Sequence, residues 1–257
     1  MQPARVDPDP VERRAIVVEI VLVGSVTLGL AAVRSLLSLI DALLATESLA
    51  AQTAVLNAPR RRVELLDLAY QLTSVVQLVA WGGLGVYLLW RAGVELRALG
   101  LDRSRPGRDV ALGAGLAALI GIPGLGFYLL SRALGANLTV VPSALDDTWW
   151  RLPVLVLAAA GNAWAEEVLV VGYLLTRLRR LGWGAGSALL ASAVLRGAYH
   201  LYQGFGGFAG NLVMGLVLGW VWQRTNRLWA LVVAHTLLDV VAFTGYALLA
   251  SRVPWLP

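Results

Sequence analysis

Residues 152–175, LPVLVLAAAGNAWAEEVLVVGYLL, form an apolar stretch that carries two adjacent carboxylates near its middle. A membrane-spanning helix needs about 20 predominantly apolar residues, and this stretch is long enough. An ionisable side chain near the bilayer centre costs roughly 2.5–3.5 kcal/mol on insertion scales, so Glu166 and Glu167 require a reason to be there. The stretch therefore predicts a membrane helix with a functional site inside it, and a purely structural ion pair is the competing interpretation.

The composition extends the membrane interpretation to the whole chain. The 257 residues are 58% hydrophobic and 14% charged, and the mean hydropathy is +0.70, which is more apolar surface than one soluble core needs. We expect an all-α fold, a polytopic transmembrane bundle of about seven or eight helices that forms one integral domain. Residues 1–109 would supply N-terminal helices and a linker, and residues 110–257 the core. Seven candidate spans lie at residues 15–44, 64–90, 110–131, 152–175, 184–203, 208–223 and 228–250.

The charged residues indicate a topology. All 21 basic residues are arginine, and they lie mainly in short loops between apolar runs, which argues against a nucleic-acid surface. Cytoplasmic loops collect positive charge. The loops on the same side of the membrane as the N-terminus hold more arginines than the loops on the other side, although the arginine triplet 60–62 lies on that other side. We expect a multi-pass cell-membrane protein, embedded in the lipid bilayer, with a cytoplasmic N-terminus and an external C-terminus. The lack of cysteine excludes disulfides and thiolate metal sites.

Both histidines of the chain also fall in apolar runs. His200 lies in VLRGAYHLYQG and His235 in LVVAHTLLDVVAF. A single histidine on an apolar face is usually a packed core residue, but two of them together with a buried diacid favour a functional site. Asp239 follows His235 by one helical turn, so the two side chains share a helix face and can hydrogen-bond. Asp239 would then orient the imidazole ring.

Two further polar side chains support the candidate site. Arg196 lies one helical turn before His200, deep enough to need a carboxylate partner, and the diglutamate 166–167 is the obvious one. A plain structural counter-ion is the alternative for this arginine. Asn211 is isolated among apolar residues, which is more typical of a helix–helix hydrogen bond than of a catalytic group.

The depths of the candidate residues disagree if all helices are straight. By the spans above, His200 lies near the outer boundary, Glu166 near the middle and His235 nearer the inner side. The glycine-rich segment 204–207 predicts a helix break, which a membrane tolerates only beside buried protein or a water-filled cavity. We expect this break, or different span ends, to bring the three side chains together.

The order of these motifs resembles that of a known family. The motifs are, in chain order, Glu166-Glu167, His200 within YHLYQG, and His235-x-x-x-Asp239. They are similar to the three motifs of the CPBP (CAAX protease and bacteriocin-processing) intramembrane endopeptidases, relatives of the Ras-converting CAAX endopeptidase. Each motif is weak alone, but three in order on successive apolar runs are fairly specific. The resemblance implies that residues 110–257 are a catalytic transmembrane core.

Two positions depart from the family pattern. Val171 stands where the family usually has an arginine after the diglutamate, and Arg196 stands where it has a phenylalanine before the second-motif histidine. The cation has moved from one helix to another. Our hypothesis is that Arg196 replaces the missing arginine and holds the diglutamate ionised.

The resemblance also implies roles for the residues. Peptide hydrolysis needs a base that activates water and donors that stabilise the developing oxyanion. Glu166 would be the general base and His200 would help to position the water. His235 and Asp239 would line the oxyanion side, with Asp239 as the orienter of the ring, and Glu167 would pair with a cation or a backbone group.

A metal-dependent mechanism is an open alternative. Glu166, His200 and His235 are side chains that zinc accepts as ligands, and a catalytic zinc keeps one position for water. The usual His-Glu-x-x-His signature is missing from the sequence. We therefore favour a glutamate mechanism that requires no cofactor, with zinc as the alternative.

The function has two rivals from other classes. Membrane-embedded Glu, His and Asp are also the parts of a proton relay, so a proton-coupled transporter is one rival, although no inverted repeat is visible. A catalytically silent membrane scaffold is the other, because of the two departures from the family pattern. For an endopeptidase, the substrate would be a membrane-associated or lipidated protein or peptide. The lysine-free composition suggests a GC-rich bacterial genome, which favours a peptide or membrane protein over a prenylated substrate.

Overall fold

The computed structural model describes residues 8–249, whose regular structure is almost entirely helical. This confirms the all-α fold class. The helices are α1 (Pro10–Val26), α2 (Leu28–Leu44), η1 (Leu49–Ala51), α3 (Glu64–Arg91), η2 (Leu96–Leu99), α4 (Pro106–Ala133), α5 (Arg151–Glu166), η3 (Glu167–Tyr173), α6 (Leu174–Arg180), α7 (Ala185–Ala198), η4 (Leu201–Gln203), α8 (Phe205–Thr225) and α9 (Leu228–Leu249). Two short strands, β1 (Thr53–Asn57) and β2 (Thr139–Ser143), pair in parallel.

The long helices identify the chain as a multi-pass membrane protein. Among residues 8–249, five helical stretches are long and apolar enough to cross a membrane: α3, α4, the continuous α5–η3–α6, α8 and α9. The pair α1 and α2, bent by 52°, adds a sixth if it counts as one broken span. α7 has 14 residues and is about 21 Å long, which is shorter than the roughly 30 Å hydrocarbon core. The prediction of a membrane span over 184–203 is therefore wrong, because the helix in this segment is too short to cross the hydrocarbon core.

The first expected span, 15–44, is two helices joined at Thr27. This residue has φ −131° and ψ −129°, outside the helical region, and its Oγ1 donates to the Val23 carbonyl at 2.6 Å. A hydroxyl that bonds the carbonyl one turn earlier offers the backbone an alternative to helix continuation. The bend thus has a local cause that the apolar pattern does not reveal.

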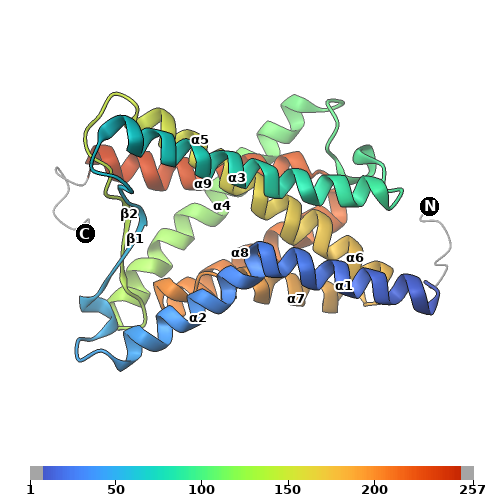
Figure 1. Cartoon of the computed structure of the whole chain (residues 1–257), viewed down its shortest axis with the longest axis horizontal. Coiled ribbons are helices and arrows are strands. Elements are labelled where there is room, and N and C mark those ends of the chain that lie inside the picture. Colours follow the sequence, from blue (N-terminus) through green and yellow to red (C-terminus); the bar gives the residue numbers. More distant parts are fainter. Residues whose placement is uncertain (1–7, 250–257) are drawn as a thin grey trace.

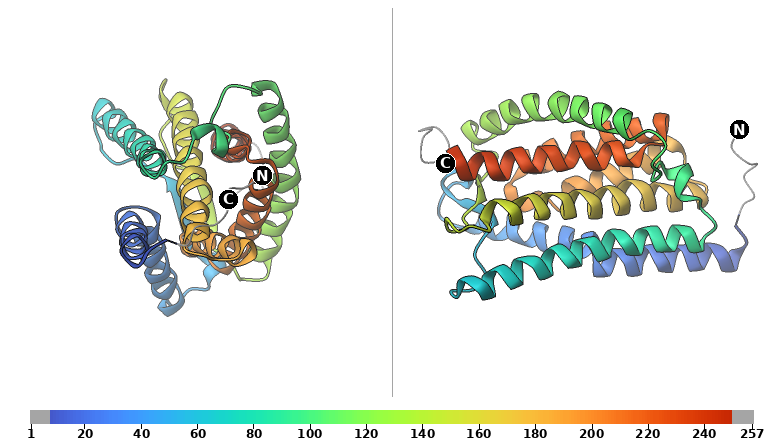
Figure 2. Two further views of the ribbon diagram at one scale, coloured as in Figure 1. Left: turned by 90° about the vertical axis from the view of Figure 1, so that its right-hand side faces the viewer. Right: turned by 90° about the horizontal axis from the view of Figure 1, so that it is seen from above.

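The helices run along the long axis of an elongated bundle. α1 begins at one end and α9 ends at the other, while β1 and β2 lie together near the end where α9 finishes (Figure 1). Seen along this axis, α1, α2 and α3 lie on one side and α4 on the opposite side of the central helices (Figure 2). The side of the membrane on which each end lies, and the division at residues 109 and 110, stay predictions. The expected end of the last span, residue 250, lies outside the described residues.

The stretch 151–180 is the central helix of the bundle. In its most apolar window 67% of the residues are buried by protein, against 11% to 39% in the other candidate spans. A helix that is apolar all round is expected in the interior of a bundle. It packs against α3 on one side and α9 on the other, and the η3 turn also contacts α7. The diglutamate lies on the most enclosed helix of the molecule.

The turn after α7 is covered by other parts of the chain. Gly204 has φ 107°, a left-handed conformation that favours glycine, and it reverses the chain between η4 and α8. The backbone N–H of Gly207 donates to Asn137 Oδ1 at 2.7 Å, and the N–H of Tyr202 donates to Ser35 Oγ at 2.6 Å. Backbone groups at membrane depth need such partners. The helix break predicted at 204–207 is confirmed: α7 ends at Ala198, η4 follows, and α8 begins at Phe205.

Candidate active site

The diglutamate lies where an α-helix becomes a wider helix. Glu166 is the last residue of α5, and Glu167 begins η3, a seven-residue π-helical stretch. Ser192 Oγ, from α7, donates to the Val170 carbonyl within this stretch at 2.7 Å. π-helical turns occur frequently at functional sites because they rotate side chains away from the regular helix register. Here the two adjacent carboxylates meet different neighbours.

Arg196 joins the two carboxylates. Its Nη2 donates to Glu167 Oε1 at 2.6 Å, and its Nη1 lies 3.4 Å from Glu166 Oε2. The side chains of Arg196 and Glu167 are both 0% exposed. A charge buried to this extent is stable only when it is paired, and the interaction with the diglutamate expected from the sequence supplies the pairing. α7 and the central helix are thereby connected by a sealed ion pair.

His235 completes a buried triad with the same carboxylate. Its Nδ1 lies 2.8 Å from Glu167 Oε1, and because a carboxylate only accepts, the ring nitrogen is the donor. Arg196 Nη1 is farther from that nitrogen, at 3.5 Å. A single oxygen of Glu167 thus accepts from both α7 and α9. The buried carboxylate fixes the orientation of the imidazole.

Glu166 has one oxygen occupied and one open. Tyr199 donates its hydroxyl to Glu166 Oε2 at 2.6 Å, the same oxygen that faces Arg196. Oε1 makes no hydrogen bond to any of residues 8–249, and the side chain retains 5% exposure. Glu167 Oε2 has no hydrogen bond to these residues either, but its side chain is 0% exposed. Of the two adjacent carboxylates, Glu166 is therefore the one whose free oxygen belongs to a side chain that keeps some exposure.

His200 lies just beyond the end of α7. Its Nδ1 donates to the carbonyl of Arg196 at 2.9 Å, so in the neutral ring the lone pair is on Nε2. The imidazole contacts two aromatic rings, with centroid distances of 4.7 Å to Tyr199 and 6.3 Å to Tyr202. The short α7 and the turn at Gly204 place His200 beside the tyrosine that binds Glu166. His200 is thereby connected to Glu166 through Tyr199, while the convergence of Glu166, His200 and His235 expected from the sequence stays a prediction.

Asp239 does not form the hydrogen bond expected with His235. The distance from His235 Nε2 to Asp239 Oδ2 is 3.6 Å, beyond a hydrogen bond, and Asp239 instead accepts from Asn162 Nδ2 at 3.0 Å. Asn162 draws the aspartate towards α5, so the structure has an ion pair with His235 Nε2 in place of the expected hydrogen bond, and the role of Asp239 in orienting the ring stays a prediction. Asp239 is still close to the imidazole, and its side chain is 18% exposed, the most open of the three carboxylates.

Asn211 forms a local bond. Its Nδ2 donates to the carbonyl of Gly207, one turn earlier in the same helix, at 3.0 Å. The helix–helix hydrogen bond considered from the sequence is therefore not the bond that this amide N–H makes. No hydrogen bond among the described residues joins the Asn211 side chain to the carboxylate–histidine cluster.

Two residues of the cluster were missed in the sequence. Tyr199 directly precedes His200, and a buried phenol needs an acceptor, so its place beside the second-motif histidine is the signal that could have found it. Asn162 lies one helical turn before Glu166, so the spacing alone places it on the same face of α5. In both cases the signal is the position of the residue in the sequence relative to a candidate site residue.

Among residues 8–249 the structure shows no assembled metal site, and the choice between a metal-free and a zinc mechanism stays a prediction. No three His, Asp or Glu side chains within this range are grouped so that they could ligate a metal ion. Glu166 Oε2 and His235 Nδ1 are held in hydrogen bonds, which leaves Glu166 Oε1 and the Nε2 atoms of both histidines as possible metal donors, and the Arg196 guanidinium lies 3.4–3.5 Å from Oε2 and Nδ1. A divalent cation would be repelled by the guanidinium at that distance. The zinc set of Glu166, His200 and His235 is not assembled in this structure.

The bundle and its buried acid–histidine cluster define a class of protein: a multi-pass membrane protein with ionisable side chains from α5, α7 and α9 in one enclosed site. Residues 148–241 match the family model described as Type II CAAX prenyl endopeptidase Rce1-like. This match agrees with the resemblance found in the sequence, supports a CPBP/CAAX protease family for the matched segment, and indicates a membrane peptidase. No curated protein and no solved structure matches the chain.

Proposed function

We propose that this chain is an intramembrane endopeptidase in which Glu166 activates a water molecule for attack on a peptide bond. The observation that carries the proposal is the asymmetry of Glu166. One oxygen is held by Tyr199 at 2.6 Å and faces Arg196, while the other has no hydrogen bond among the described residues. A general base must be held in place and still present a free lone pair to the water that it deprotonates. Glu167 is fully enclosed and cannot serve in this way.

The histidines supply the other parts of the reaction. His200 donates Nδ1–H to a carbonyl and so offers the Nε2 lone pair, which can accept a hydrogen bond from the attacking water. His235 is held through Nδ1 by Glu167, and its Nε2 faces the side of Asp239. As an imidazolium, His235 would use Nε2–H to stabilise the oxyanion that develops on the scissile carbonyl. Glu166 would then give the proton that it took from the water to the leaving amine as the C–N bond breaks, so that Glu166 and the imidazolium both return to their starting states.

Arg196 is a positioning residue in this proposal. It is 0% exposed and contacts both carboxylates, so it fixes their separation and compensates their charge. It lies where the family usually has phenylalanine, and it stands in for the arginine replaced by Val171. The relocation hypothesis fails if Arg196→Ala leaves both folding and peptidase activity intact.

A metal-free mechanism agrees best with the hydrogen bonds of the site. The open oxygen of Glu166 can deprotonate water without a Lewis acid, and the Arg196 guanidinium supplies a positive charge where a metal ion would otherwise do so. Purified protein, treated with a chelator and analysed for bound metal, is expected to keep its peptidase activity. Loss of activity that zinc restores would contradict this part of the proposal.

The substrate proposed is a membrane-associated peptide or protein, lipidated or not. The test uses the full chain reconstituted in liposomes, with leader-bearing and lipidated peptides, and products identified by mass spectrometry. Glu166→Gln is expected to lower cleavage by about 10²–10⁴-fold, the usual contribution of a general base. Glu95→Gln, an exposed carboxylate before η2, is the matched control and should retain activity.

The other outcomes separate the rival functions. Uptake of peptide or protons into the liposomes without cleavage would favour a transporter and overturn the proposal. Binding without cleavage or uptake would favour a silent scaffold. Equal cleavage by the wild type and by Glu166→Gln would remove Glu166 from the mechanism.

A further inference from the structure

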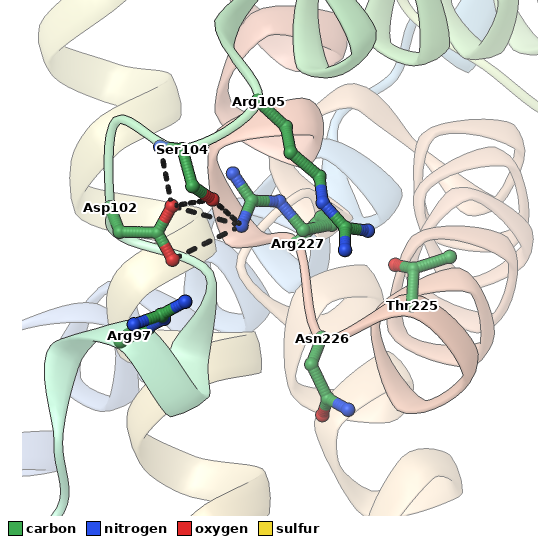
Figure 3. Close-up of a pocket in the computed structure, with 7 residues that line it drawn as sticks. All are labelled: Arg97, Asp102, Ser104, Arg105, Thr225, Asn226 and Arg227. Carbon is green, nitrogen blue, oxygen red and sulfur yellow. Dashed lines mark hydrogen bonds and ion pairs between the residues drawn. The ribbon is translucent and has the colours of Figure 1, made fainter.

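A second polar site lies at one end of the bundle, separate from the carboxylate–histidine cluster. It is a pocket of about 210 Å³ between η2 with its following loop and the short junction of α8 and α9 (Figure 3). Its lining consists of three arginines, one carboxylate and three uncharged polar residues: Arg97, Arg105, Arg227, Asp102, Ser104, Thr225 and Asn226. The volume is below the roughly 300–1,000 Å³ of sites for drug-sized ligands, so the pocket suits a small polar group.

One arginine of the pocket is neutralised by the protein. Arg227 Nε donates to Asp109 at 2.8 Å, and its Nη1 lies 3.2 Å from both oxygens of Asp102. Asp102 also accepts hydrogen bonds from the side chain and the backbone N–H of Ser104, and together with Arg227 these lower its pKa to about 2. The carboxylate is therefore ionised at neutral pH, and its charge is committed to Arg227.

The other two arginines are uncompensated. Within residues 8–249 neither the Arg97 nor the Arg105 guanidinium makes a hydrogen bond or an ion pair. Figure 3 shows Arg105 extending between Arg227 and Thr225, and Arg97 on the side of Asp102. Arg105 also precedes the first turn of α4, which no side chain caps, so the positive end of that helix adds to the potential. Neither of these two guanidinium groups has a partner among the described residues, and the three arginines of the pocket outnumber the two carboxylates, Asp102 and Asp109, that bind Arg227.

The pocket lies at the level where membrane helices end. α4 begins directly after Arg105, α8 ends at Thr225, and α9 begins directly after Arg227, and all three are candidate spans. The ends of membrane helices lie at the headgroup region of the bilayer. Arginine forks match the oxygens of a phosphate group, and basic pockets between membrane helices bind anionic headgroups.

We propose that this pocket binds the phosphate group of an anionic membrane lipid through Arg97 and Arg105. The same chemistry would also recognise the phosphate of a soluble compound, so the experiment must distinguish the two sources. The site is independent of the peptidase proposal, because its ligand binding can be measured without any cleavage.

Native mass spectrometry of the detergent-purified, delipidated full chain tests the proposal. Phosphatidylglycerol and phosphatidylcholine are added separately, and phosphatidylglycerol is expected to bind about tenfold more tightly or better, the range for a charge-assisted hydrogen bond. Arg97→Gln/Arg105→Gln should lose this preference. Arg103→Gln, an exposed arginine of the same loop that does not line the pocket, should keep it.

The control variants separate binding from folding. The double lysine variant, Arg97→Lys/Arg105→Lys, keeps both charges and should retain part of the preference. The unfolding midpoints of all variants should equal that of the wild type without lipid, because the two guanidinium groups have no protein partner. Equal binding of the two lipids, or a preference that persists in the glutamine variant, would overturn the proposal. Inorganic phosphate that binds as tightly as the lipid and displaces it would assign the site to a soluble phosphate compound instead.

Discussion

Removal of the buried cation is the most informative perturbation of the candidate site. Arg196→Gln keeps much of the side-chain volume but deletes the charge that faces Glu166 and Glu167, at 3.4 Å and 2.6 Å. Both partners stay in an enclosed site, since Glu167 is 0% and Glu166 5% exposed. Two neighbouring carboxylates would then repel each other with little solvent to screen them.

The expected cost can be estimated from the burial. Breaking a buried ion pair by removing one partner costs about 3–5 kcal/mol, because the remaining charge is uncompensated. For a chain of this size, about 1 kcal/mol lowers the unfolding midpoint by roughly 2–4 °C, so Arg196→Gln should lower it by roughly 6–20 °C.

A double-mutant cycle isolates the pair. Arg196→Gln/Glu167→Gln removes both charges and leaves two amides that can hydrogen-bond, so it should recover most of the loss, with a coupling energy of about 2–3 kcal/mol. The control is the pair of Arg151 and Asp147, 2.9 Å apart, in which the aspartate is 88% exposed. An ion pair of this kind should show coupling of about 1 kcal/mol or less.

The assay is thermal and denaturant unfolding of the full chain in detergent micelles, followed by intrinsic tryptophan fluorescence. Losses that simply add in the Arg196 and Glu167 double variant would refute the reasoning. So would a cost of Arg196→Gln that equals the cost of Arg151→Gln. Either result would mean that the buried cation does not hold the diglutamate.

Three further predictions test separate parts of the structure. Tyr199→Phe loses a hydrogen bond to a buried carboxylate and should lower the free energy of unfolding by about 1–3 kcal/mol and also slow turnover, as measured by unfolding and peptide cleavage; an unchanged turnover would show that the hydroxyl has no positioning role. Asp102 has a folded-state pKa of about 2, lowered mainly by its hydrogen bonds with Ser104, against 3.8 in the unfolded chain. The stability that its carboxylate contributes is therefore complete above about pH 4 and is lost as the pH falls towards 2. The difference in unfolding midpoint between the wild type and Asp102→Asn should shrink over that interval, and a constant difference would contradict the assignment. Gly113→Ala would bring a Cβ to 2.8 Å from a backbone carbonyl of α9 and should cost about 1–3 kcal/mol in an unfolding assay, whereas Gly115→Ala, which meets open space, should be neutral or stabilising.

The fold class and most spans could be predicted because the apolar runs are long and the interruptions are charged. The candidate site residues could be selected because ionisable side chains are costly in the bilayer. These residues are Glu166, Glu167, His200 and His235. The structure brings their elements together, while their catalytic roles remain proposals. The pairing of Arg196 with the diglutamate could also be predicted, because a cation at that depth needs a carboxylate partner.

The rest depends on local backbone geometry and on tertiary competition. The bend at Thr27 and the π-helical stretch from Glu167 arise from hydrogen bonds that leave no periodic signal in the sequence. Helical spacing correctly placed Asp239 beside His235, but it could not show that Asn162 would attract the aspartate and that Glu167 would hold the ring. A spacing rule describes one helix, and the choice between partners is made by the neighbouring helices.

A single-turnover cleavage in H₂¹⁸O most directly tests whether Glu166 activates water for peptide hydrolysis. The reconstituted full chain is mixed in excess with a membrane-associated peptide that it cleaves, and the products and the digested enzyme are analysed by mass spectrometry. The account predicts one ¹⁸O atom in the new carboxylate of the product, no label on Glu166, and a rate about 10²–10⁴-fold lower in a folded Glu166→Gln variant. Cleavage by that variant at the wild-type rate, or ¹⁸O on Glu166 itself, would contradict it.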